Sequence, residues 1–565
     1  MFKQNWRWVI GALLAFTLAA CGGGNTGSAG APAATTSKPA APAGPVVLHV
    51  GWAGSPDTLN PGTAQLVEAG TIDALVYNSL FALQFDGTYK PDLAESYKVA
   101  DDGKTWTFKI HQGVKFHDGQ PLTAKDVAFS FNLYKAHDDF PYLNFYTTDF
   151  DKIEAPDDTT VVLTLKDAIP NLESQLLSLY VLPEHIWTKV KDGKAAAEFQ
   201  NLEMIGSGPF KLKEYKQKEF VHLVANKAYF QTPPKIDEII FQTFGSEDTL
   251  VQALKTGQVD MITKLPNTAV ATLKRAENVK LVSGAPLSPY VRDIYFNQVS
   301  KENCPKDKGK CTGHPALKDH NVRLALAYAT DKQNIIDVAM LGLAKPGLTL
   351  VASGQAYWFD NSIKDYPFDI AKANQILDDA GYKDKNGDGV REMPDGTHPL
   401  IFRLQFPNNY PELPRVAELL GQTWAKIGVK TEPQTVDPDA LTAACCPTFD
   451  YDVILWNWSW GPDPNDPLGV MRTDQIASGN NETGYSNPAY DKLYDQQAVE
   501  LDKAKRKQLV WQMQEMVHKD VVYVIPYYPD TVEAYRADRF QGWITDKPTL
   551  ELENPQNLVT IEPVK

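Results

Sequence analysis

Apolar side chains recur along the chain with two different periods, and the period predicts the type of element. Residues 105–110, TWTFKI, alternate Trp106, Phe108 and Ile110 with polar neighbours, which is the pattern of a half-buried strand. Residues 46–50 form a short apolar run that also predicts a strand. Sheet structure is therefore expected early in the chain.

A helix is predicted to begin at Thr123. Thr123 and Asp126 have the spacing of a capping box, in which each side chain bonds the backbone N–H of the other. The helix that follows would carry the apolar side chains Val127, Phe131 and Tyr134.

Strand and helix patterns alternate between residues 400 and 459. The predicted elements are a strand at 400–406, a helix at 411–427, a strand at 429–436, a short helix at 437–444 and a strand at 451–456. Such alternation predicts a βαβ arrangement with parallel strands, and hence an α/β fold.

The segment WNWSWGPDPNDP, residues 456–467, follows the last of these strands. Its prolines exclude regular structure, so we expect a fixed loop beyond the carboxyl end of a strand, where open α/β sheets bind ligands. There Trp458 and Trp460 would enclose apolar groups while Asp463 accepts a cation. In the alternative, which we prefer for Trp456, the tryptophans pack in the core and the aspartates cap turns.

The start of the chain has the pattern of a secretory signal. Lys3 and Arg7 precede an apolar run that is too short to span a bilayer, and small residues then lead to Cys21. Residues 1–20 are therefore predicted to be a signal peptide. The cysteine resembles that of the bacterial lipobox, which predicts lipidation of Cys21; the alternative is an ordinary secretory signal.

Residues 21–45 consist almost wholly of Gly, Ala, Ser, Thr and Pro, which predicts a flexible lipidated tether. The rest of the chain is too long for one core, so two or more lobes are expected. A formal net charge of −15 makes nucleic acid an unsuitable partner, because phosphate binding requires basic patches. We interpret the acidity as a source of solubility.

The cysteines beyond the tether form two close pairs. Outside the cytoplasm Cys304 and Cys311 are predicted to form a local disulfide. A zinc site that adds His314 and His320 is disfavoured, because the spacing fits no common zinc motif. The adjacent pair at 445–446 is compatible with a vicinal disulfide or with two buried thiols.

Residues 384–395, DKNGDGVREMPD, resemble a calcium-binding loop, with oxygen ligands at positions 1, 3, 5, 9 and 12 and glycine at position 6. The candidate ligands are Asp384, Asn386, Asp388, Glu392 and Asp395. Aspartate in place of glutamate at the last position weakens the pattern, so a surface turn without metal is preferred. No other cofactor is expected.

The longest recognisable motif is PDLAESYKVADDGKTWTFKIHQGVKFHDGQPLTAKDVAFSFNLY at residues 91–134, which resembles the signature of the family 5 extracellular solute-binding proteins, the oligopeptide and dipeptide receptors of ABC importers. Further matches are residues 58–61, 206–210, 295–297, 321–327, 478–493 and 503–528. They extend over nearly the whole chain beyond the tether.

The resemblance implies a periplasmic-binding-protein-like α/β fold of type II, cluster C, with two main α/β lobes, a hinge and an extra subdomain. It divides the chain into lobe I at 46–82, 206–296 and 530–565, lobe II at 83–205, and lobe III at 297–529. The hinge would lie at the crossovers near Asn297 and Tyr528, and closure on a ligand would favour the closed state.

In peptide-binding members of this family an acidic residue in a tryptophan-containing loop, before an Asp-Pro pair, holds the ammonium group of the peptide. Here Trp460, Asp463 and Asp466-Pro467 fall at the matching spacing. The resemblance therefore implies an ion pair at Asp463, a wall formed by Trp458 and Trp460, and a lesser contribution from Tyr527 and Tyr528. Gly-Pro before Asp463 and proline after it depart from the family pattern. As partners for a carboxylate, Arg292, Arg323 and Arg472 are candidates, the second more suited to a structural role.

The predicted protein is thus a lipid-anchored receptor on the extracytoplasmic face of the cell membrane. It would act as a monomer, bind peptides and deliver them to an ABC permease, with no enzymatic activity of its own. Because the family also includes receptors for nickel complexes, opines and oligosaccharides, such solutes are the alternative cargo. A hydrolase is disfavoured because the known catalytic motifs are absent, and a surface chaperone or adhesin is a third possibility.

Overall fold

The computed structural model describes residues 44–564 of the 565-residue chain, with gaps at 138, 191–192 and 264. The predicted signal peptide at 1–20, the lipidation site Cys21 and nearly all of the tether at 21–45 lie outside the described residues. Residues 45–565 form one unit, which is described here by itself. Among its described helices, none is long and apolar enough to cross a membrane.

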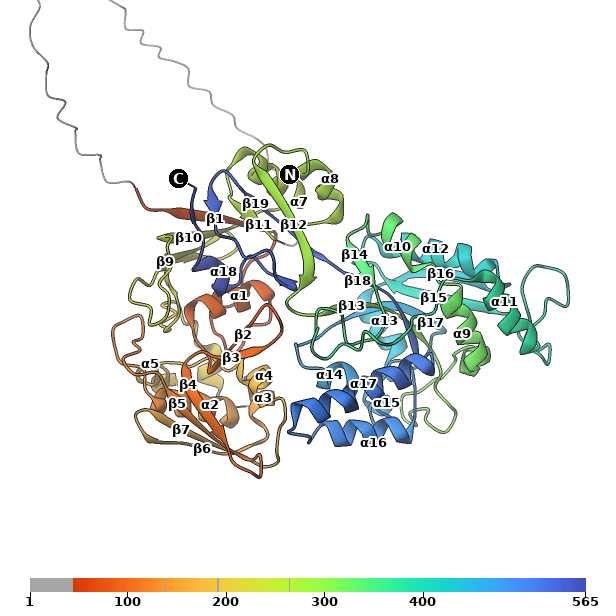
Figure 1. Ribbon diagram of the computed structural model, residues 1–565, viewed down its shortest axis with the longest axis horizontal. Coiled ribbons are helices and arrows are strands. Elements are labelled where there is room, and N and C mark those ends of the chain that lie inside the picture. The colour runs from red at the N-terminus through yellow and green to blue at the C-terminus, as the bar shows by residue number, and fades with distance from the viewer. Residues whose placement is uncertain (1–43, 138, 191–192, 264, 565) are drawn as a thin grey trace, which may run out of the picture. The chain divides into compact units, whose positions relative to one another are not determined.

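The largest sheet has eight strands, in the order β21-β12-β19-β11-β1-β10-β9-β8, and combines three distant segments of the chain, so red, yellow-green and blue strands lie side by side in Figure 1. Its strands are β1 (Val47–Trp52), β8 (Phe210–Lys216), β9 (Phe220–Ala225), β10 (Glu238–Thr243), β11 (Met261–Ile262), β12 (Val279–Pro286), β19 (Thr531–Arg536) and β21 (Thr549–Leu550). The adjoining elements are α1 (Val67–Val76), α7 (Glu247–Thr256), α8 (Asn267–Leu273), α18 (Pro555–Leu558) and the pair β20 (Phe540–Gln541) and β22 (Glu562–Pro563).

An antiparallel four-stranded sheet, in the order β4-β5-β7-β6, is built from one continuous segment. Its strands are β4 (Ala94–Val99), β5 (Thr105–Ile110), β6 (Phe150–Asp157) and β7 (Thr160–Leu165). The other elements of this segment are β2 (Phe81–Leu83), β3 (Tyr89–Pro91), α2 (Ala124–Ala136), α3 (Pro141–Thr147), α4 (Leu172–Leu176), α5 (Glu184–Trp187), the 3-10 helix η1 (Thr188–Val190) and α6 (Gly193–Glu198).

A mixed six-stranded sheet, in the order β14-β18-β13-β17-β15-β16, organises the rest of the chain. Its strands are β13 (Tyr290–Phe296), β14 (Ala344–Pro346), β15 (Ile401–Pro407), β16 (Lys430–Val436), β17 (Val453–Ser459) and β18 (Tyr523–Pro529). The helices are η2 (Pro315–Lys318), α9 (His320–Tyr328), α10 (Lys332–Val338), α11 (Ile370–Asp379), α12 (Leu413–Ala425), α13 (Pro438–Cys445), α14 (Asn465–Gly469), α15 (Gln475–Ser478), α16 (Pro488–Gln497) and α17 (Lys503–Lys519).

The predicted elements agree closely with these. Strand β5 spans the predicted residues 105–110, and Thr123 and Asp126 form the predicted capping box of α2. Strand β15 pairs in parallel with both β16 and β17, as the alternating pattern predicts. Strand β17 runs on to Ser459, beyond the predicted end at residue 456, because it pairs along its whole length with β13.

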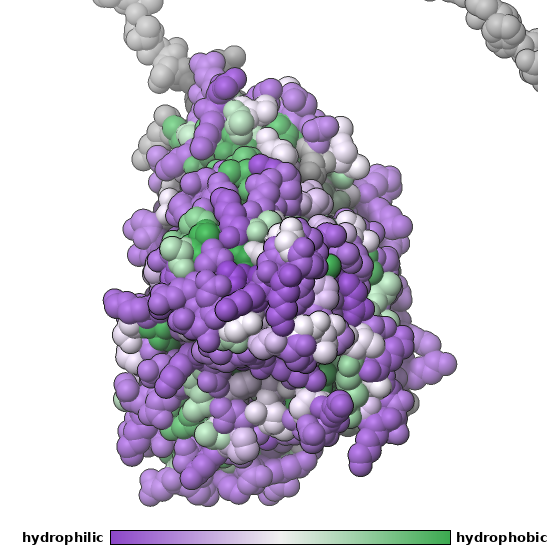
Figure 2. Space-filling view, turned by 90° about the vertical axis from the view of Figure 1, so that its right-hand side faces the viewer, coloured by the Kyte–Doolittle hydropathy of each residue, from purple (hydrophilic) through white to green (hydrophobic). Residues whose placement is uncertain are grey.

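Most of the hydrophobic core falls into two bodies, although one further cluster joins β11 and β19 to Leu343, which lies next to β14. One continuous cluster of buried residues includes Leu48 of the eight-stranded sheet and Phe108 of the four-stranded sheet. The six-stranded sheet has separate clusters, with Ile294 in one and its neighbour Tyr295 in another, as expected for side chains on opposite faces of a strand. The face drawn in Figure 2 is mostly hydrophilic, with hydrophobic residues in small separate groups.

The chain passes between the eight-stranded and six-stranded sheets at two places. Strand β12 ends at Pro286 in the first sheet, and β13 begins at Tyr290 in the second. Strand β18 ends at Pro529, and β19 begins at Thr531 in the eight-stranded sheet. The family resemblance predicts crossings near Asn297 and Tyr528. The first crossing lies several residues before Asn297, and the second lies directly after the strand that contains Tyr528.

Candidate ligand-binding site

The end of β17 and the loop that follows it bring two tryptophan rings together. The indoles of Trp458 and Trp460 stack with their ring centroids 4.5 Å apart and their planes 11° from parallel. The backbone N–H of Trp460 donates to the carbonyl of Pro289 at 3.0 Å, which holds the loop against the crossing between the two larger sheets. Only 8% of Trp460 is exposed, and neither ring lines the cavity described below, so a role of these tryptophans in ligand binding stays a prediction.

Asp463 forms a buried ion pair with Arg506 of α17. Its two carboxylate oxygens accept hydrogen bonds from the two terminal nitrogens of the guanidinium, each at 2.7 Å. The side chains are 6% and 3% exposed, respectively. Oδ1 also accepts the backbone N–H of Asn465 at 2.9 Å. Asp463, the residue predicted to bind an ammonium group, is therefore already paired with Arg506, a residue that was not among the predicted site residues.

Arg506 is itself held in place on every side. Its Nε donates to Gln497 Oε1 at 3.0 Å, and its guanidinium carbon lies 4.8 Å from the ring centroid of Trp358. A planar guanidinium that pairs with a carboxylate in this two-pronged way is a fixed feature of the site rather than a mobile surface charge.

A cavity of about 380 Å³ lies beside this ion pair. Its lining comes from both bodies of the molecule: Tyr89, Tyr97, Val99, Ala100, Trp106, Pro170, Asn171 and Glu173 on one side, and Trp358, Asp463, Glu500, Leu501, Lys503 and Arg506 on the other. Three carboxylates and two basic side chains leave the lining with a formal net charge of minus one. The volume falls in the usual range for small-molecule sites.

The wall opposite Asp463 is aromatic. Tyr97 stacks on Trp106 with ring centroids 5.5 Å apart and an interplanar angle of 12°. The hydroxyl of Tyr97 donates to Glu173 Oε1 at 2.5 Å, which fixes this carboxylate at the cavity. Burial raises the pKa of Tyr89, and the nearby charge of Asp463 raises it further, so the phenol stays neutral. The cavity thus combines aromatic faces with carboxylates.

Tyr527 and Tyr528 lie in the interior of the six-stranded sheet, with 0% and 5% of their surface exposed. The hydroxyl of Tyr528 donates to the carbonyl of Thr349 at 2.7 Å and accepts two backbone N–H bonds. These contacts give Tyr528 a structural task within its own sheet. A role of either tyrosine in ligand binding stays a prediction.

The candidate carboxylate partners are also engaged. Arg292 is buried and donates to Glu412 Oε1 at 2.6 Å. Arg323 donates to three backbone carbonyls, consistent with the structural role that suits it better. Arg472 lies against Asp474 at 2.9 Å.

Both cysteine pairs are joined. Cys304 and Cys311 form a disulfide with their Cα atoms 6.1 Å apart, and Cys445 is bonded to Cys446. The imidazole of His314 contacts the carbonyl of Pro399 and that of His320 the carbonyl of Lys519, so each ring has a backbone partner.

The predicted calcium loop lies between α11 and β15 as a turn whose residues are mostly exposed, although Glu392 is buried. Carboxylate oxygens of Asp384, Asp388 and Glu392 lie within 4.8 Å of one another. Asp384 also accepts the backbone N–H groups of two glycines, and Asp395 caps a separate turn at Thr397. These bonds account for the loop as a surface turn, and calcium binding stays a prediction.

Known proteins match this chain in sequence over most of its length. Over 489 residues the chain is 28% identical to the oligopeptide-binding protein AppA of Bacillus subtilis, with 86% of each chain covered. It is 31% identical over 511 residues to di/tripeptide-binding protein 1 of Pseudomonas aeruginosa, covering 85% of this chain and 88% of the relative. It is 30% identical to heme-binding protein A of Haemophilus influenzae, covering 83% and 84%.

Solved structures agree with these relatives. The substrate-binding protein CtaP of Listeria monocytogenes superposes with a TM-score of 0.77 at 28% identity, covering 92% of this chain and 99% of that chain. AppA of Bacillus subtilis, solved in complex with a nonapeptide, superposes with a TM-score of 0.67 at 26% identity, covering 92% and 99%.

These relatives define the class of this two-bodied α/β protein: it is a solute-binding component of an ABC importer. Residues 88–482 match the family described as bacterial extracellular solute-binding proteins, family 5 middle, and the chain belongs to this family. The relatives are substrate-binding proteins of transporters rather than enzymes. The predicted fold class, family and lack of enzymatic activity are thereby confirmed.

Proposed function

We propose that this chain is a lipid-anchored receptor that captures peptides in the cavity beside Asp463 and delivers them to a membrane permease. The observation that carries this proposal is the charge of the cavity. Glu173, Asp463 and Glu500 outnumber Lys503 and Arg506, so the enclosed space favours a ligand that brings one positive charge. The ammonium group at the free amino terminus of a peptide supplies such a charge locally.

The ion pair leaves room for this ammonium. Among the described residues, Asp463 Oδ2 accepts a hydrogen bond only from Arg506, and a carboxylate oxygen can accept a second. Glu173 comes from the opposite side of the cavity. An ammonium between Asp463 and Glu173 would therefore favour the state in which the two sides are close together.

The aromatic wall suits the remainder of a peptide. Tyr97 and Trp106 present stacked rings to the cavity, and such surfaces accept many different side chains by apolar contact. Two of the relatives are named for binding oligopeptides or di- and tripeptides, and AppA was solved with a nonapeptide. These names support a peptide as the cargo without fixing its length.

A non-peptide solute is the second candidate. Arg506 already neutralises Asp463, so a ligand without an ammonium group would leave this pair undisturbed. One relative is named for heme, and an oligosaccharide, an opine or a nickel complex are further cargo classes. Such a ligand would use the rings of Tyr97 and Trp106 more than the carboxylates.

Native mass spectrometry of the purified chain tests the cargo most directly. The proposal expects a bound species whose mass, after release and fragmentation, reads as a peptide. Identification of a sugar, a metal chelate or a porphyrin would replace the peptide with the second candidate. Membrane attachment is tested separately by Cys21→Ser, which we expect to move the chain from the membrane fraction to the soluble fraction; unchanged fractionation would contradict the lipid anchor.

A further inference from the structure

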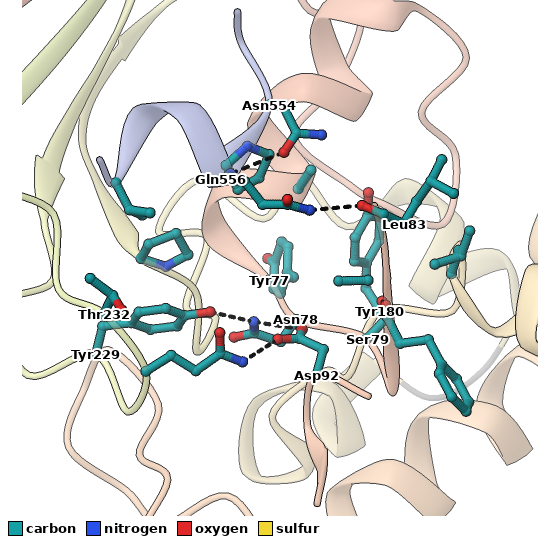
Figure 3. A pocket seen from close by; sticks show the side chains of 18 of the residues that line it. Tyr77, Asn78, Ser79, Leu83, Asp92, Tyr180, Tyr229, Thr232, Asn554 and Gln556 are labelled. Atoms are coloured by element: carbon teal, nitrogen blue, oxygen red, sulfur yellow. Dashed lines mark hydrogen bonds between the residues drawn. The ribbon is translucent and has the colours of Figure 1, made fainter. Parts of the chain in front are cut away.

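A second and larger cavity, of about 570 Å³, lies at the junction of the eight-stranded and four-stranded sheets (Figure 3). It is lined by residues 74–92, 177–180, 209–232 and 544–560, with individual positions taken from each range. None of these ranges belongs to the six-stranded sheet or its helices. The cavity is therefore separate from the one beside Asp463 and does not depend on how the two bodies close.

One wall of this cavity is a row of hydrogen-bonded polar side chains, visible across the lower part of Figure 3. Asn78 Nδ2 donates to Asp92 Oδ2 at 2.9 Å and to the hydroxyl of Tyr229 at 3.0 Å. Gln231 Nε2 donates to Asp92 Oδ1 at 2.6 Å. The hydroxyl of Ser207 donates to Asn78 Oδ1 and so fixes the orientation of the side-chain amide. The row holds the carboxylate in a defined position at the cavity.

Asp92 is a buried carboxylate whose two side-chain partners are neutral amides. It is 8% exposed, nearly as buried as Asp463 at 5%. Asp463 has a guanidinium as its partner, whereas among the described residues no lysine or arginine forms an ion pair with Asp92. Burial raises the pKa of Asp92 to about 6, although the amides of Asn78 and Gln231 and the nearby imidazole of His111 oppose the shift, so the group is ionised at neutral pH at an energetic cost. A cation that entered the cavity would offset this cost.

The other walls are aromatic and uncharged. Tyr77 and Tyr180 have their ring centroids 6.0 Å apart, and Phe81 and Tyr229 add two further rings. Opposite the polar row, Gln556 Nε2 donates to the carbonyl of Leu83 at 2.8 Å (Figure 3). Among the described residues that line the cavity, Asp92 alone is charged. Aromatic faces around a single carboxylate are the surroundings that an organic cation prefers.

We propose that this cavity is a second binding site, for a small organic ammonium ion such as an alkylamine. The ammonium group would bind Asp92, and the alkyl part would lie between Tyr77, Tyr180 and Phe81. A neutral polyol would use the amides of Asn78 and Gln231 instead, and it would not depend on the charge of Asp92. Binding that is lost when Asp92 is neutralised therefore distinguishes an ammonium ion from a neutral polyol.

The site lies wholly within one of the two bodies. Its walls belong to the two sheets that share one hydrophobic cluster, so a ligand there would stabilise this body without bridging to the six-stranded sheet. The protein should consequently be able to hold cargo in the cavity beside Asp463 and an amine in this cavity at the same time.

The test uses the purified chain, isothermal titration calorimetry and three probes of similar size: butylammonium, butanol and butyrate. We expect saturable binding of butylammonium, at least tenfold weaker binding of butanol, and none of butyrate. The variant Asp92→Asn should weaken butylammonium at least tenfold and leave the binding of cargo unchanged. Asp101→Asn, an exposed acidic position in the same body, serves as the matched control and should bind butylammonium like the parent chain.

Absence of saturable butylammonium binding, or binding that Asp92→Asn leaves unchanged, would overturn the proposal. If Asp92→Asn does not fold, crystals of the parent chain provide the test. Soaked with 3-bromopropylammonium, they should show anomalous bromine density in this cavity. Bromine density found only beside Asp463 would also contradict the proposal.

Discussion

At the scale of single residues, the ion pair between Asp463 and Arg506 means that the substitution Asp463→Asn changes the stability of the fold. Asp463→Asn leaves a guanidinium that is 3% exposed without its counter-ion. Removal of one partner from a buried pair costs about 3–5 kcal/mol, so we expect the free energy of unfolding to fall by that amount. Urea denaturation of the parent and variant chains measures the difference.

The double variant Asp463→Asn with Arg506→Gln is the control for this prediction. Two neutral amides can bond each other, so much of the lost stability should return. A single variant as stable as the parent would show that the ion pair does not form. Because Asp463→Asn weakens the fold itself, a test of the ammonium contact should change the ligand instead of Asp463.

Asp293 carries a second residue-scale prediction, on pH. It lies fully buried in β13, and burial raises the pKa of its carboxyl to about 8, although the charge of Arg292 opposes the shift. A raised pKa means that the folded state retains the proton longer than the unfolded state does. The stability contributed by the protonated form is therefore lost as pH rises from about 4 to about 8.

Asp293→Asn removes this titration, because the amide stays neutral. Relative to the variant, the parent chain should lose on the order of a few kcal/mol between pH 5 and pH 9. Melting temperatures of both chains at the two pH values measure the loss. Parallel melting curves for parent and variant across this interval would refute the raised pKa.

At the scale of elements, the capping box of α2 is an independent stabilising feature. The side chain of Asp126 accepts the backbone N–H of Thr123 at 2.8 Å, and the Thr123 hydroxyl accepts a backbone N–H in return. Thr123→Ala should cost about 1 kcal/mol, the usual effect of a lost N-terminal cap. Thr123→Ser, which keeps the hydroxyl, should remain close to the parent in the same denaturation experiment. Equal losses in both variants would contradict the role of the cap.

Elements such as α2 and β5 could be predicted because their patterns are local. The end of β17 could not, since its last residues are held by pairing with β13, far away in the sequence. The loop with Trp460 and Asp463 was found from its composition. Arg506 stands in a basic run with Lys503, Lys505 and Lys507, and composition does not distinguish it from them. Helical spacing would have done so, because Arg506 falls on the same face as the buried Val510 and Val517.

At the scale of the whole molecule, the proposed capture of a ligand depends on two bodies that meet at one cavity. The division follows from the hydrophobic clusters, one shared by the eight-stranded and four-stranded sheets and others that belong to the six-stranded sheet. Sequence patterns could predict that a chain of this length has several lobes, but not which sheets share a core. Association of two bodies around a ligand requires that the ligand bind the closed state better than the open state.

The most direct test of the central claim compares two forms of one peptide, trialanine with a free amino terminus and the same peptide acetylated at that terminus, by isothermal titration calorimetry on the purified chain. The free form is predicted to bind at least tenfold more tightly, because its ammonium supplies the positive charge that Glu173, Asp463 and Glu500 favour. Equal affinity for the two forms, or tighter binding of the acetylated one, would contradict the claim.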